Sequence, residues 1–133
     1  MGIAGTAPVT RGKHFKVEAL VLTTGDVPAR AFLTQFSKED GKWFRQQARM
    51  LASIDVFANT PHGRFLNREM FKAVENSKGV FAFKAFQLRL YCFSAPGGRL
   101  ILAFGVIKQK DKHDARDIRR AEELREEFLQ TVK

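Results

Sequence analysis

Residues 81–107, FAFKAFQLRLYCFSAPGGRLILAFGVI, contain the clearest strand and turn patterns of the sequence. Apolar side chains recur at alternate positions through 81–86 and again through 88–93, which predicts two consecutive strands or one long bent strand. Pro96-Gly97-Gly98 supplies the positive-φ freedom that a tight hairpin needs. Residues 100–107 are almost continuously apolar, as in a strand that is covered on both faces. We therefore expect a hairpin whose second arm is the central strand of a sheet.

The residues before this stretch predict one strand and a helical region. Residues 15–22 alternate and then become apolar on both faces before a Thr-Thr-Gly-Asp turn, which predicts a first strand. Pro28 suits the first turn of a helix, and residues 37–40 resemble a capping box. A helical stripe then continues to about Ile54. Two antiparallel helices, or one bent helix, follow from this pattern.

The remaining segments complete the expected order. Residues 1–14 are rich in small residues without periodicity, so they predict a flexible leader or a tail held by a partner. The mixed pattern of residues 64–76 predicts no clear conformation. Asp114 can cap a last helix whose apolar stripe extends to Val132. We expect a single domain over residues 15–133 with the element order β-α-α-β-β-β-α.

The charge of the chain points to a polyanionic partner. Twenty-three Lys and Arg against fourteen Asp and Glu give a formal net charge of +9 and a pI of about 10.1. Such an excess favours contacts with phosphates, although a generally basic surface without a specific partner has the same composition. No stretch approaches the length of about 20 apolar residues that a membrane span needs, and no signal peptide is evident. We expect a cytoplasmic protein that does not contact membranes.

Three motifs in order carry a resemblance to a known family. They are FKAFQLRLYCF, then PGGRLILAFGVIKQKDK, then DARDIRRAEEL, and they lie between Phe81 and Leu124. Together they resemble the RelE/ParE/HigB toxin superfamily, and more closely its phage-derived Gp49-like branch. The resemblance implies an α+β, RelE-like fold, in which a small, mostly antiparallel sheet packs against two N-terminal helices and a C-terminal helix.

The resemblance also implies an activity and a set of catalytic residues. Family members that cut RNA use no metal, because the 2′-hydroxyl of the substrate attacks the adjacent phosphate and expels the 5′-oxygen. Such a site needs a base, an acid and cations around the developing charge. Arg89 is the first candidate, since a guanidinium holds phosphate oxygens with a fork of donors, and Lys84 could share its face of the sheet. Lys108 and Lys110 follow the central strand, where the family carries basic catalytic residues.

His113 and Asp114 are the most chemically suggestive neighbours, since an imidazole titrates near neutral pH and serves as base or acid. They depart from the family, which often has Thr-Pro at this point, and Asp114 is equally explained as a helix cap. Lys112, Lys72 and Arg68 are further candidates for RNA binding. The histidines and Cys92 lack zinc spacing, and nucleotide-binding and serine-hydrolase motifs are absent from the sequence, so we expect no cofactor, no metal and no small-molecule ligand.

Three functions remain open at this stage. The first is the toxin of a type II toxin–antitoxin system, a ribosome-dependent mRNA endonuclease whose partners are the ribosome, mRNA and a cognate antitoxin, often of helix-turn-helix type. The second is a ParE-like inhibitor of DNA gyrase that cleaves nothing. The third is a non-catalytic, phage-derived nucleic-acid-binding protein. One scaffold can serve all three, so the chemistry of the site has to separate them.

Overall fold

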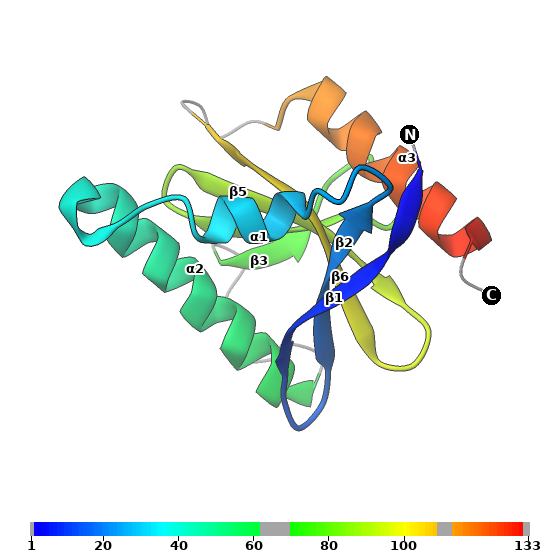
Figure 1. The fold of residues 1–133 in the computed structure, drawn as a ribbon, viewed down its shortest axis with the longest axis horizontal. Coiled ribbons are helices and arrows are strands. Elements are labelled where there is room, and N and C mark those ends of the chain that lie inside the picture. Colours follow the sequence, from blue (N-terminus) through cyan, green and yellow to red (C-terminus); the bar gives the residue numbers. More distant parts are fainter. Residues whose placement is uncertain (1, 62–69, 109–112, 132–133) are drawn as a thin grey trace.

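The structure is a computed structural model, and it describes residues 2–61, 70–108 and 113–131. Within these ranges six strands and three α-helices form one mixed sheet with helices on both faces (Figure 1). In chain order the elements are β1 (Ile3–Arg11), β2 (Lys16–Leu22), α1 (Pro28–Leu33), a short 3-10 helix (Lys38–Asp40), α2 (Lys42–Asn59), β3 (Phe71–Ala73), β4 (Phe81–Ala85), β5 (Leu88–Ala95), β6 (Arg99–Ile107) and α3 (Ala115–Thr131).

The expected RelE-like order β-α-α-β-β-β-α is wrong. The observed order is β-β-α-α-β-β-β-β-α, because β1 precedes the first expected strand and β3 precedes the hairpin region. β1 occupies most of the stretch that we expected to be a flexible leader. Its pairing with β2 shifts register between Ile3 and Gly5 and again between Pro8 and Thr10, which disturbs the two-residue periodicity that marks a strand in sequence. β3 has only three residues, which is too short for any period to show.

The six strands lie side by side in the order β1-β2-β6-β5-β4-β3. β2 runs parallel to β6, from the pair Lys16 and Arg99 to the pair Ala19 and Leu102, and the other neighbouring strands are antiparallel. The hairpin expected at residues 96–98 is present between β5 and β6, and β6 lies inside the sheet. The expected first strand, the two helices near it and the last helix are also present.

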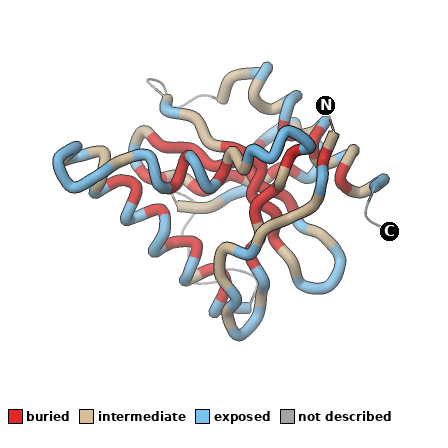
Figure 2. Tube along the Cα trace, viewed as in Figure 1, coloured by how far each residue is buried: buried red, intermediate tan, exposed pale blue. Residues whose placement is uncertain are grey.

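Each face of the sheet buries its own apolar cluster. Alternate residues of one strand enter different clusters, as in β6, where Leu100 and Leu102 pack with α1 and α2 and Ile101 and Ala103 pack with α3. Figure 2 shows the buried residues concentrated in the strands and on the inner sides of the helices. Both faces of β6 are buried from Leu100 to Phe104, which explains why this part of the strand is apolar without alternation.

Gly105 allows α1 to approach the sheet closely. A Cβ atom at Gly105 would overlap the ring of Phe32, which belongs to α1 and is buried. The glycine therefore fits a close approach between helix and strand rather than a turn. Among the described residues, no helix is long and apolar enough to cross a membrane.

Candidate functional site

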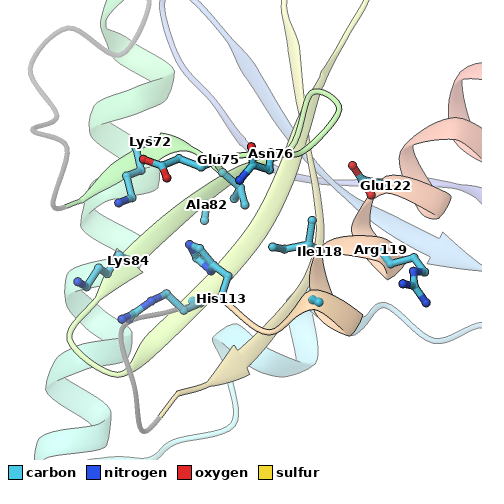
Figure 3. Close-up of a pocket in the computed structure, with 12 residues that line it drawn as sticks. Lys72, Glu75, Asn76, Ala82, Lys84, His113, Ile118, Arg119 and Glu122 are labelled. Carbon is cyan, nitrogen blue, oxygen red and sulfur yellow. The ribbon is translucent and has the colours of Figure 1, made fainter.

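A cavity of about 630 Å³ opens on the face of the sheet that carries α3. α3 packs against β1, β5 and β6, whereas the cavity lies between the start of α3 and the strands β3, β4 and β5 (Figure 3). Four cations and two carboxylates line it together with one histidine, so the formal charge of its walls is positive. The lining ionisable residues are Lys72, Lys84, Arg89, Arg119, Glu75, Glu122 and His113.

Lys84 and Arg89 lie on the same face of the sheet. They are directly opposed partners in the antiparallel pairing of β4 with β5, and both line the cavity. Directly opposed residues point to the same side of a sheet, and residues two apart on a strand do so as well. Tyr91, two residues after Arg89, therefore points to this face too. The expectation from the sequence that Lys84 shares a face of the sheet with Arg89 is confirmed.

Arg89 is much more buried than a surface cation. Only 2% of the residue is exposed, and its Nη1 atom donates hydrogen bonds to the carbonyl oxygens of Phe86 and Leu88. These bonds tie the guanidinium to the turn between β4 and β5. Its positive charge still reaches the cavity, because it contributes to lowering the pKa of His113. Arg89 therefore acts on the cavity through its fixed charge as well as by lining the wall.

His113 reaches the cavity from the segment before α3 and is held by Tyr91. Its Nδ1 atom lies 2.8 Å from the hydroxyl oxygen of Tyr91, and the two rings meet edge to face with centroids 5.4 Å apart. Figure 3 shows the imidazole between the side chains of Lys84 and Ile118. Because Nδ1 is occupied by the tyrosine, Nε2 is the nitrogen that can exchange a proton with a bound molecule.

The surroundings of His113 favour the neutral imidazole. Burial lowers its pKa, and the positive charges of Arg89, Lys72, Lys108 and Lys84 lower it further. Burial also raises the pKa of the Tyr91 hydroxyl, so this group keeps its proton at neutral pH. The imidazole is therefore in the base form at neutral pH, and the same burial and cations favour release of a proton that it has accepted.

Asp114 takes the role of a helix cap. Its Oδ1 accepts a hydrogen bond of 2.8 Å from the backbone nitrogen of Arg116 and lies 3.6 Å from the Nε atom of the same residue. The hydrogen bond from this backbone nitrogen is the largest cause of the lowered pKa of the Asp114 carboxyl, and the positive charge of Arg116 lowers it further. His113 and Asp114 are neighbours in sequence, but one turns to Tyr91 and the other to the helix. The structure does not bring them together as a pair.

Lys108, at the end of β6, forms an ion pair with α3. Its Nζ lies 2.8 Å from Oδ2 of Asp117 on α3, and only 14% of its side chain is exposed. It does not line the cavity, although its charge reaches His113. Of the other candidates, Lys72 lines the cavity from β3, whereas Lys110, Lys112 and Arg68 lie outside the described residues.

Sequence reasoning missed Tyr91, Arg119, Glu75 and Glu122. Tyr91 was assigned to an apolar strand, although its spacing from Arg89 already placed both on one face. The other three could not be placed, because their position depends on how α3 and the turn after β3 approach the sheet. One carboxylate oxygen of Glu122, Oε2, already accepts a hydrogen bond of 2.8 Å from the backbone nitrogen of Lys78.

Comparison with known proteins adds no family. No protein-family model matches the chain, and no curated protein matches it either. The resemblance to the RelE/ParE/HigB superfamily therefore rests on the sequence motifs alone. In the part of the chain that the structure describes, no three His, Cys, Asp or Glu side chains come together as a possible metal site.

Proposed function

We propose that the protein is an endoribonuclease that cuts messenger RNA by attack of the 2′-hydroxyl on the adjacent phosphate. The observation that carries the proposal is His113, whose Nδ1 is held by the Tyr91 hydroxyl at the wall of a cavity lined mainly by cations. Binding alone would be served by lysines and arginines. A neutral imidazole held by a hydrogen bond is the arrangement that proton transfer requires.

The proposed reaction has two proton transfers, one from the 2′-hydroxyl and one to the 5′-oxygen. Nε2 of His113 takes the proton of the 2′-hydroxyl as the 2′-oxygen bonds to phosphorus. The bond from phosphorus to the 5′-oxygen breaks, which leaves a 2′,3′-cyclic phosphate on one fragment. The departing 5′-oxygen needs a proton, and the ammonium group of Lys84 is a suitable donor because an alkoxide is far more basic than an amine. For His113 to act as base, Nδ1 must carry hydrogen and donate it to the Tyr91 oxygen.

The cations of the cavity serve the charge that develops on the phosphate. Lys84 and Lys72 line the wall from β4 and β3, and the buried Arg89 adds a charge that cannot be lost by titration. Charges that are fixed before the substrate arrives stabilise a transition state without reorganisation. The two carboxylates reduce the net charge of the walls but do not reverse it.

The sequence resemblance adds partners to the proposal. We infer that cutting takes place on translating ribosomes and that a neighbouring gene encodes an antitoxin that blocks the basic cavity. The gyrase-inhibitor alternative gains no specific support, because inhibition by binding has no use for a general base.

Expression in cells tests the function. The wild type, His113→Ala and His14→Ala should be induced without a partner, and transcript 5′ ends should be mapped. His14 is an exposed histidine between β1 and β2 and serves as the matched control. We expect growth arrest with cuts phased to codons for the wild type and His14→Ala, and neither effect for His113→Ala. Growth arrest without phased cuts would reject the proposal, and DNA-damage signalling with trapped gyrase would replace it with the gyrase alternative.

A further inference from the structure

A large aromatic side chain is exposed at the turn between β4 and β5. Phe86 is 62% exposed and has a φ of 56°, in the left-handed region that favours glycine or asparagine. Ala85 and Leu88 form the last pair of the hairpin, so Phe86 and Gln87 are its two turn residues. A glycine would meet the backbone requirement without strain. The stability of the turn therefore does not account for phenylalanine at this position.

The turn is held on several sides. Arg89 donates a hydrogen bond to the carbonyl oxygen of Phe86, and the backbone nitrogen of Gln87 donates one of 3.1 Å to Oε1 of the buried Gln46 on α2. The carbonyl oxygen of Gln87 accepts a further bond of 2.7 Å from the backbone nitrogen of Lys108. Because the backbone is anchored in this way, the Phe86 ring is presented to solvent from a fixed base.

Cations lie beside the ring on α2 and on the strands that its turn connects. The guanidinium carbon of Arg49, on α2, lies 5.6 Å from the centre of the Phe86 ring. Arg45 is exposed one helical turn earlier on the same side of α2. On the sheet side, Lys84 precedes Phe86 by two residues and lines the cavity. The turn that bears the ring thus joins two strands that line the cavity, and the ring itself lies beside a basic side of α2.

This combination fits a single-stranded nucleic acid. Aromatic faces stack on bases of any sequence, and flanking cations hold the phosphates on either side. A protein partner that covered an isolated phenylalanine would be expected to offer it an apolar pocket and to meet these arginines with carboxylates. Because Lys84 and Arg89 flank this turn in the hairpin and line the cavity, an RNA strand that leaves the cavity past these two cations would reach the turn.

We propose that Phe86 is a stacking platform for a base of the bound RNA next to the cut, and that Arg49 and Arg45 guide the strand beyond it. This inference rests on the proposed function, because it describes the course of the same substrate outside the cavity. Phe86 is a positioning residue, since it contacts a base and not the reacting phosphate. The inference also explains why a residue that is unfavourable for this backbone conformation occupies the turn.

Binding of short single-stranded 2′-O-methyl RNA tests the inference, because this probe cannot be cut by 2′-hydroxyl attack. Fluorescence anisotropy should compare it with a matched strand that has abasic sites. We expect the wild type to bind the intact strand about tenfold more tightly than the abasic one. Phe86→Leu should lose this preference, and Phe86→Tyr should keep it. Phe86→Asn should lose the preference and unfold at a temperature equal to or above that of the wild type.

The outcomes separate the two proposals. Lys84→Gln should weaken the binding of both strands by a similar factor, since phosphates are present in each. If Lys84→Gln weakens both strands but Phe86→Leu keeps the preference for bases, the stacking platform is rejected while the proposed function stands. If the wild type binds neither strand, the stacking platform is rejected, while the proposed function is decided by the cleavage assay on translating ribosomes. A fall in the unfolding temperature of both Phe86→Leu and Phe86→Asn would show that the ring stabilises the turn itself, and would also reject the platform.

Discussion

Tyr91 and His113, which are 22 residues apart, are joined by a contact of 2.8 Å between the tyrosine hydroxyl oxygen and Nδ1 of the imidazole. Tyr91 belongs to β5 and is fully buried, so it provides a rigid point of attachment for a histidine that lies outside the regular elements. The contact fixes which ring nitrogen remains for chemistry. It also places that nitrogen beside a cavity whose walls are mainly cationic.

Replacing Tyr91 with phenylalanine should slow RNA cleavage. The ring and its packing remain, but the hydrogen bond that orients His113 is lost, and a bond of this kind contributes about 1 kcal/mol. We expect the cleavage rate at saturating RNA to fall by about fivefold to tenfold with little change in KM. Single-turnover kinetics measure this change, and an unfolding curve serves as the control for folding. A cleavage rate for Tyr91→Phe equal to that of the wild type would show that the tyrosine hydroxyl does not contribute to catalysis.

The pH dependence of cleavage should reflect the lowered pKa of His113. Burial and the nearby cations favour the neutral imidazole, so the base form persists below the ordinary value of about 6.5. We expect kcat/KM to fall only when the pH drops through this lowered pKa. Lys84→Gln removes one positive charge and should move the acidic limb of the profile upward. Lys13→Gln, an exposed position between β1 and β2 at the far edge of the sheet, should leave the limb in place. An acidic limb above 6.5 in the wild type would contradict this assignment.

Asp114 should matter for stability and not for catalysis. Asp114→Ala removes the side-chain bond to the backbone nitrogen of Arg116, and the loss of such a cap costs about 1 kcal/mol. Asp114→Asn can still accept this bond and should retain most of the stability. Urea unfolding measures both variants. Cleavage rates should remain close to that of the wild type. A large loss of activity in Asp114→Asn would show that the carboxylate takes part in catalysis.

Gly105→Ala should destabilise the protein because the added methyl group meets the Phe32 ring. Overpacking of a well-filled interior costs about 1–3 kcal/mol, which urea unfolding can measure. In a Phe32→Leu background the same substitution should cost less, since a smaller side chain leaves room for the methyl group. Equal costs in the two backgrounds would show that the two residues are not coupled.

The sequence predicts the middle of the sheet well and its edges poorly. β5 and β6 are recognisable because both faces are buried, which makes their apolar character strong and continuous. β1 lies at an edge, where half-exposed small residues and interrupted pairing leave no period to detect. β3 is too short to have a pattern. For these reasons the expected element order lacked two strands.

The sequence predicted the residues of the candidate site that lie on strands, but not the contacts between distant elements. Lys84 and Arg89 follow from strand alternation, because opposed residues share a face whatever the fold around them. The contact of Tyr91 with His113 depends on where the chain runs between β6 and α3, which periodicity does not specify. Likewise, the ion pair of Lys108 with Asp117 joins a strand end to a helix. A sequence can place such residues in their elements but not bring them together.

Purified protein should be assayed for RNA cleavage to test the proposed reaction. Wild type, His113→Ala and His14→Ala should be added to messenger RNA on translating ribosomes, and the new 3′ ends should be analysed. We predict a 2′,3′-cyclic phosphate at each cut for the wild type and His14→Ala, and a rate for His113→Ala that is lower by about 10²–10⁴-fold. Equal cleavage by His113→Ala, or new 3′ ends without any cyclic phosphate, would contradict the proposed mechanism.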